Sequence, residues 1–151
     1  MMEPNFEKFF DAYAAAFNRS LGENVDAEAI MACFADSFIG AGPTGVLCGQ
    51  NGPKFREVLQ GGYKFYKDVG TERMVVRGLD VTTIDPNHHM AIVHWRAHYT
   101  RKDGSPVSID FDVAYLLQTL RGETPKIFAY VAGDEMAALE KHGLIEVKRK
   151  P

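Results

Sequence analysis

The 151-residue sequence lacks most of the motifs by which a reaction class is recognised. It has only two cysteines, Cys33 and Cys48, and no CxxC, HExxH or GxxxxGK[ST] pattern. The strong signals for zinc, thiol redox and P-loop nucleotide sites are therefore missing. Because both cysteines lie in apolar surroundings and no signal peptide precedes them, we expect two buried thiols rather than a disulfide.

An excess of one charge and long apolar runs are missing as well. Seventeen Lys and Arg residues stand against twenty Asp and Glu residues, which gives a net charge of -3. This near balance does not favour nucleic acid or an anionic membrane as a partner. No segment approaches the roughly 18 apolar residues of a membrane span, so we expect a cytoplasmic protein.

Hydrophobic residues are abundant, at 46% of the chain, and 11% of the residues are aromatic. A chain of this length and composition can bury the core of one domain. We expect a single domain over residues 1–151, with a mobile tail over residues 146–151.

Apolar periodicity predicts helices mainly in the first half of the chain. A stripe of aromatic residues from Phe6 to Phe17 recurs at helical spacing. A second, short helix should follow, capped by Asn24 or Asp26, and a third should run from about residue 53 to 69. A last helix, EMAALEKH, has Asp134 as its N-cap and a glycine at its C-terminal end.

Strands are predicted between these helices and in the second half. The segment SFIGAGPTGVLCGQ suits two short strands around a tight turn, which we interpret as the rim of a pocket. Four longer runs are rich in β-branched and aromatic residues: 73–84, 89–100, 107–117 and 126–132. This order of elements specifies an α+β fold with helices packed on one face of an antiparallel sheet.

The element order resembles the NTF2-like superfamily, which includes SnoaL-like polyketide cyclases and ketosteroid isomerases. Four segments carry the resemblance: YAAAFN, FADSF, HWRAHYTRKDG and PKIFAYVAGDEMAALEKHGL. It implies a cystatin-like cone, in which a curled sheet with three N-terminal helices and a short C-terminal helix encloses an apolar pocket. No cofactor is implied. The expected pocket residues are Phe17, Phe34, Phe38, Tyr63 and Trp95.

The resemblance also suggests the oxyanion-binding part of an isomerase site, without its catalytic base. Tyr13 matches the oxyanion-binding tyrosine of ketosteroid isomerases, and Asp112, or else Asp110, falls near the aspartic acid that assists it. The position of the catalytic base is occupied by Gly42, which cannot accept a proton. Steroid isomerase chemistry therefore does not carry over directly, although Asp110 or Asp36 remains a possible base.

The turn signal Asp103-Gly104 predicts how the two central strands pair. A two-residue turn there places Trp95 opposite Asp112, with both aspartates pointing into the cone. An aromatic, dry environment would then raise the pKa of Asp112, which could donate a hydrogen bond alongside Tyr13. The alternative is that the aspartates face solvent or pair with arginine, and that Tyr13 is a core residue.

The opposite face of this strand pair carries His94, Arg96 and His98. Two histidines four residues apart on a strand are about 13 Å apart, so we expect no metal site. A half-polar sheet face of this kind suits a homodimer interface.

Three functions remain open at this stage. The first is a cofactor-independent enzyme that moves a proton in an apolar keto or hydroxy compound, using Tyr13, Asp112 and Asp110. The second is a non-catalytic binding or assembly module with the same pocket. The third, an epoxide hydrolase of the limonene type, needs an interlocked Asp-Arg-Asp set, and Arg96 is expected on the wrong face for it.

Overall fold

The structure is a computed structural model that describes residues 4–146. Beyond residue 146, the expected tail lies outside the described residues. Four helices are present: α1 (Phe6–Ser20), α2 (Ala27–Met31), α3 (Pro53–Asp68) and α4 (Glu135–Lys141). None of the helices within the described range is both long and apolar enough to cross a membrane.

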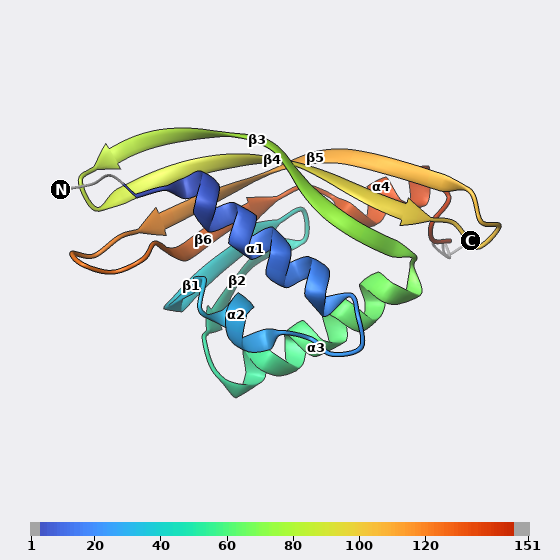
Figure 1. Cartoon of the computed structure of the whole chain (residues 1–151), viewed down its shortest axis with the longest axis horizontal. Helices are drawn as coiled ribbons and strands as arrows, with labels where there is room; N and C mark the ends of the chain where they lie inside the picture. Colours follow the sequence, from blue (N-terminus) through green and yellow to red (C-terminus); the bar gives the residue numbers. More distant parts are fainter. Residues whose placement is uncertain (1–3, 147–151) are drawn as a thin grey trace.

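The strands form one six-stranded sheet that arches over α1, α2 and α3 (Figure 1). They are β1 (Phe34–Gly42), β2 (Gly45–Gln50), β3 (Thr71–Asp85), β4 (His88–Thr100), β5 (Pro106–Gln118) and β6 (Lys126–Ala132). Their order in the sheet is β2-β1-β6-β5-β4-β3, and all neighbours are antiparallel except β1 and β6. The predicted α+β class with a curled sheet is confirmed, and the parallel pair is an addition to it.

The helix boundaries have local causes. Asn5 caps α1 by accepting a hydrogen bond from the backbone N–H of Lys8 at 3.0 Å, and Asp26 caps α2 in the same way through Ala29 at 3.3 Å. The buried stripe of α1 includes Phe10, which is fully inaccessible to solvent. This stripe packs the helix against the sheet, because an aromatic face of this size is stable only when it is removed from water.

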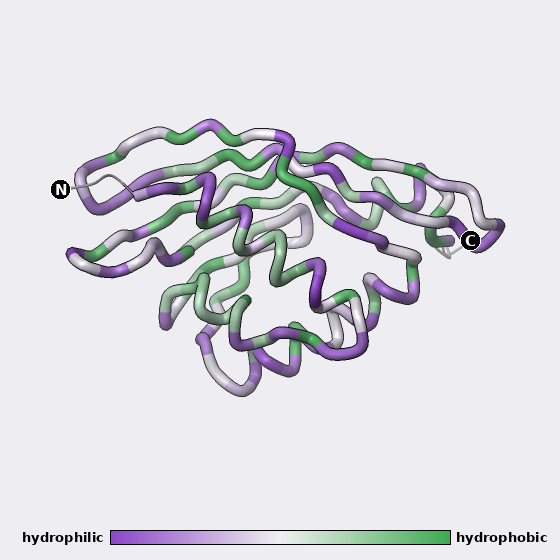
Figure 2. The backbone as a smooth tube through the Cα atoms, in the orientation of Figure 1, coloured by the Kyte–Doolittle hydropathy of each residue, from purple (hydrophilic) through white to green (hydrophobic). Residues whose placement is uncertain are grey.

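Buried and more exposed residues alternate strictly along β4 and β5, so successive side chains lie on opposite faces of the sheet. Both hydrophilic and hydrophobic residues occur along these strands (Figure 2). The odd-numbered residues of both strands, from Ala91 to Tyr99 and from Val107 to Leu117, face the helices. The even-numbered residues face outward. For convenience we call these the inner and outer faces of the sheet.

The predicted register of β4 and β5 is wrong by one residue. Trp95 pairs with Phe111, whereas Asp112 pairs with His94. The cause is the turn: the backbone N–H of Arg101 donates to the carbonyl of Ser105 at 2.9 Å, which leaves three residues between them instead of two. The last of these, Gly104, takes a positive φ of 89°, as expected of a three-residue hairpin loop. A shift of one residue moves a side chain to the opposite face.

The expectation of buried thiols is wrong for one cysteine. Cys33 is half-buried beneath α2, but Cys48 is exposed because it lies on β2, the edge strand of the sheet. Edge strands lack a neighbour on one side and gain less cover from the core.

Candidate functional site

A cavity of about 550 Å³ lies between the inner face of the sheet and the helices α1, α3 and α4. All six tyrosines of the chain line it, together with the single tryptophan, Trp95. The tyrosines are Tyr13, Tyr63, Tyr66, Tyr99, Tyr115 and Tyr130. The wall is therefore aromatic and mostly apolar, and its main polar groups are phenolic hydroxyls.

Tyr13 comes from the buried stripe of α1 and reaches one end of this cavity. Its ring centroid lies 6.1 Å from that of Trp95 and 6.4 Å from those of Phe34 and Tyr115. Burial raises the pKa of Tyr13 well above its usual value, and the neighbouring phenols raise it further. The hydroxyl stays protonated, and within residues 4–146 no side chain or backbone group is hydrogen bonded to it.

Tyr115 lies beside Tyr13 and is tied to the tryptophan. The indole Nε1–H of Trp95 donates a hydrogen bond to the Tyr115 hydroxyl oxygen at 3.2 Å, and both residues are buried. Burial raises the pKa of Tyr115, while the hydrogen bond from Trp95 partly opposes this shift. Since Tyr115 accepts from the indole, its own O–H remains available as a donor. Tyr13 and Tyr115 are thus two neighbouring neutral donors on the cavity wall.

Glu135, the first residue of α4, also lines the cavity, and sequence reasoning missed it. Its carboxylate accepts a hydrogen bond from the hydroxyl of Tyr66. Much of the residue is open to solvent, but desolvation of its carboxyl group raises the pKa of Glu135 above the usual value. Burial, and then the charge of Glu135, raises the pKa of Tyr99 to about 12. Glu135 and these two tyrosines form what we call the mouth of the cavity.

Four of the five predicted pocket residues, Phe17, Phe34, Tyr63 and Trp95, are on the cavity wall. Phe38 instead packs behind the wall, with its ring 5.0 Å from that of Phe34. The glycine-rich β1–β2 turn, expected at the pocket rim, is not among the lining residues of the described chain. Whether the wall residues contact a ligand remains a prediction.

Asp110 and Asp112 do not point into the cavity, which corrects the expected site. Asp112 borders the cavity through its position in β5, but its carboxylate lies on the outer face, 2.7 Å from Nδ1 of His94. The Asp110 carboxylate accepts hydrogen bonds from Arg96 at 2.7 and 3.0 Å. The one-residue register shift is the physical reason, since it exchanges the faces of these side chains.

These aspartates belong to a charged network on the outer face. Arg77 lies 3.5 Å from Asp110 and 3.8 Å from Asp112, so an Asp-Arg-Asp set does exist, on the side away from the cavity. His94 is held between Asp112 and Asp80, whose oxygens lie 2.7 and 2.9 Å from its two ring nitrogens. The hydrogen bonds that the ring donates to Asp80 and Asp112 raise the pKa of His94. An epoxide hydrolase site would need this set inside the cavity.

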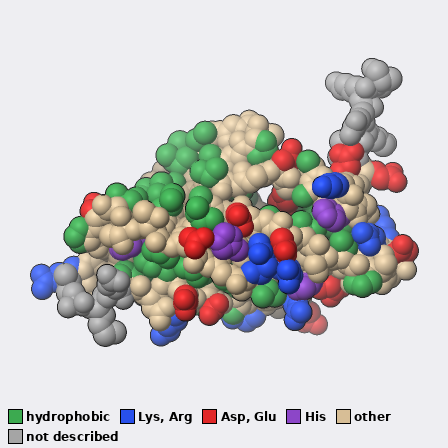
Figure 3. Space-filling view, turned by 90° about the horizontal axis from the view of Figure 1, so that it is seen from above, with side chains coloured by type: hydrophobic (Ala, Val, Ile, Leu, Met, Phe, Trp, Pro, Cys, Tyr) green, Lys and Arg blue, Asp and Glu red, His purple; other side chains and the backbone are tan. Residues whose placement is uncertain are grey.

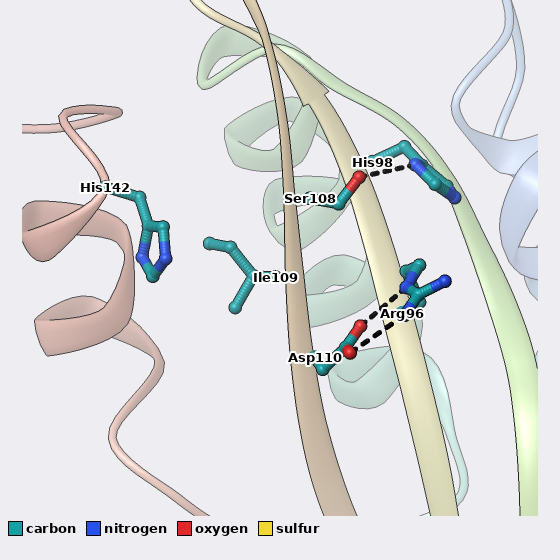
Figure 4. A pocket seen from close by; sticks show the side chains of 6 residues that line it. All are labelled: Arg96, His98, Ser108, Ile109, Asp110 and His142. Carbon is teal, nitrogen blue, oxygen red and sulfur yellow. Dashed lines mark hydrogen bonds and ion pairs between the residues drawn. The ribbon is translucent and has the colours of Figure 1, made fainter.

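A second hollow, of about 410 Å³, runs along β5, where residues 106–112 have no partner in β6. Figure 4 shows His142 on one side of β5 and Arg96 and His98 on the other. Its polar side chains are hydrogen bonded within the protein. Ser108 Oγ lies 2.8 Å from Nδ1 of His98, and Nδ1 of His142 lies 2.8 Å from the carbonyl oxygen of Ala138. Because these groups already have partners, the hollow offers little to a ligand.

The outer face divides into two regions. Charged side chains gather around the middle of the view in Figure 3, and hydrophobic side chains cover much of the surface beside them. Exposed apolar side chains of the strands β6, β1 and β2 include Val131, which is 57% exposed, Ile39 at 44% and Val46 at 66%. The homodimer expected through this face remains a prediction. Among residues 4–146, no group of three or more His, Cys, Asp or Glu residues is arranged to hold a metal ion.

Solved structures resemble this fold at low sequence identity. A ketosteroid isomerase-like protein from Erwinia carotovora atroseptica is 18% identical over 84% of this chain and 91% of its own, with a TM-score of 0.59. An NTF2-like superfamily protein from Salmonella enterica is 11% identical over 86% and 89%, with a TM-score of 0.60. A cystatin-like protein from Caulobacter vibrioides is 16% identical over 89% and 92%, with a TM-score of 0.62. At these identities, the likeness concerns the fold alone.

Sequence comparison adds the family. No curated protein matches this chain significantly. The model of the family described as NTF2-like protein (DUF6841) matches residues 3–135, which is most of the sequence. The chain is therefore a member of this NTF2-like family.

Proposed function

We propose that this chain binds an apolar small molecule with a keto or hydroxy oxygen, and that Tyr13 and Tyr115 donate hydrogen bonds to that oxygen. The observation that carries the proposal is the convergence of all six tyrosines and the only tryptophan on one cavity. Aromatic residues scattered in a core would not share one open space. A volume of about 550 Å³ falls within the roughly 300–1,000 Å³ of typical small-molecule sites.

The two hydroxyls set the chemistry of the bound group. Both phenols stay neutral because burial raises their pKa values, so they donate hydrogen bonds and do not carry charge. A ligand oxygen in the cavity would accept a hydrogen bond from each of them. The same arrangement would stabilise negative charge that develops on a carbonyl oxygen.

Turnover is the second candidate, favoured by this donor pair and by the likeness to a ketosteroid isomerase-like fold. Proton transfer also needs a base next to the substrate. The positions expected to supply this base do not: Asp110 is bound to Arg96 on the outer face, Asp36 is not among the cavity-lining residues of the described chain, and Gly42 has no side chain. Asp112 is likewise bound to His94 on the outer face, and Glu135, the carboxylate at the mouth, interacts with Tyr66. We therefore place binding before catalysis.

A fluorescence titration of Trp95 with 2-naphthol tests the proposal, because this phenol offers an oxygen on an apolar ring system. We expect saturable quenching that weakens about 2- to 10-fold in Tyr13→Phe, the loss of one hydrogen bond of roughly 0.5–1.5 kcal/mol. Asp112→Asn is the matched control, since its side chain lies on the outer face. Flat titrations would contradict the proposal, as would quenching that responds to Asp112→Asn and ignores Tyr13→Phe.

A further inference from the structure

The mouth of the cavity carries a carboxylate. The cavity wall contains three acidic residues. Asp112 is bound to His94 on the outer face, and Asp134 accepts a hydrogen bond from the backbone N–H of Ala137 at 2.9 Å as the cap of α4. Glu135 follows Asp134 in the chain and is the acidic residue that interacts with two tyrosines of the wall, Tyr66 and Tyr99.

The cavity wall offers no positively charged side chain to balance the negative charge of Glu135. No Lys, Arg or His is found among the cavity-lining residues of the described chain. An anionic ligand would find no cation there and would face the charge of Glu135. A carboxylate can accept up to about four hydrogen bonds, so Glu135 can bind a further donor while it keeps the one from Tyr66.

The aromatic rings at the mouth add a second attraction for a cation. Tyr66 is hydrogen bonded to Glu135, and Tyr99 lies close enough to Glu135 for its pKa to respond to that charge. The faces of tyrosine rings attract cations within about 6 Å of the ring centre. A carboxylate surrounded by aromatic rings is a combination that suits an ammonium group.

We infer that the mouth of the cavity binds a protonated amine, with the ammonium on Glu135 against Tyr66 and Tyr99 and the apolar body of the ligand inside the cavity. This inference rests on the proposed function and names the class of ligand: an apolar or aromatic amine. Such a cation would also offset the desolvation that raises the pKa of Glu135.

Calorimetric titration with three naphthalene derivatives of similar size tests this. At pH 7.5, 2-naphthylmethylamine is a cation, 2-naphthylmethanol is neutral and 2-naphthoate is an anion. We expect the amine to bind about 5- to 10-fold more tightly than the alcohol, and the anion to bind most weakly. Glu135→Gln retains the size of the side chain and an acceptor for Tyr66. It should abolish the preference for the amine, so that the amine and the alcohol bind with similar affinity.

The outcomes separate this inference from the proposed function. Asp112→Asn, on the outer face, should bind all three compounds as the wild type does. If the alcohol binds but the amine is not preferred, or if the preference survives in Glu135→Gln, the ammonium site is wrong and the proposed pocket stands. If none of the three compounds binds, both proposals fall. Tighter binding of 2-naphthoate would overturn the ammonium site directly.

Discussion

The hydrogen bond between Trp95 and Tyr115 predicts that two similar tyrosine substitutions will have different effects on stability. Tyr115→Phe removes the acceptor of the indole N–H, and Trp95 is only 1% exposed, so the N–H is left without its protein partner in largely buried surroundings. Tyr13→Phe removes a hydroxyl that has no hydrogen-bond partner within residues 4–146.

The magnitudes follow from these environments. A buried donor left without its acceptor costs about 1–3 kcal/mol, so Tyr115→Phe should lower the free energy of unfolding by that amount. A hydroxyl without a protein partner contributes little to stability, and Tyr13→Phe should change the free energy of unfolding by less than about 0.5 kcal/mol. For a chain of this size, each kcal/mol corresponds to a shift of about 2–4 °C in the melting temperature.

Urea unfolding followed by Trp95 emission measures both variants with one probe, because the chain has a single tryptophan. Equal destabilisation by the two substitutions would refute the reasoning, since it would mean that the Tyr13 hydroxyl has a structural partner. A stable Tyr115→Phe variant would equally refute it, because the indole N–H would then have another acceptor.

Two further predictions concern the backbone and the outer face. Gly70 has a φ of +93°, and an added Cβ would lie 2.1 Å from the carbonyl oxygen of Thr100, so Gly70→Ala should cost more than about 2 kcal/mol in urea unfolding. Gly104→Ala, at a φ of +89° with open space around the Cβ, should cost only about 1–2 kcal/mol, and equal losses would contradict the overlap. The pKa of His94 is raised above 6.5 by its two aspartates, so its stabilisation is present below that value and is lost as pH rises through the raised pKa. The melting temperature of the wild type, relative to His94→Gln, should therefore be higher at pH 5.5 than at pH 8.5; a constant difference would argue against the charged contact.

The helices and strands were predictable because each has a local signal. Apolar periodicity located α1 and the long strands, and the caps Asp26 and Asp134 were visible as side chains suited to helix N-termini. The register of β4 and β5 was not predictable from the Asp103-Gly104 pair, because two- and three-residue loops use similar residues. The choice depended on a backbone hydrogen bond from Arg101 to Ser105, which no residue pattern specifies.

The candidate site was predictable only in part, for a related reason. Tyr13 was named as a site residue because it matches the oxyanion-binding tyrosine of the ketosteroid isomerases that the chain resembles, and the helical period of α1 gave the direction of its side chain. Glu135 offered no such signal, since it follows a helix cap and its position over the cavity depends on how β6 and α4 lie in the fold. Asp112 was assigned to the wrong face because an error of one residue in the register reverses a strand side chain.

The alternation of β4 and β5 gives the protein two surfaces that can change independently. A substitution at an odd-numbered position alters the cavity wall, as at Trp95 or Tyr115, and leaves the outer charges in place. A substitution at an even-numbered position, such as Arg96, alters the outer surface without touching the cavity. During divergence, the cavity wall and the outer surface can therefore change separately, with the backbone of two strands serving both.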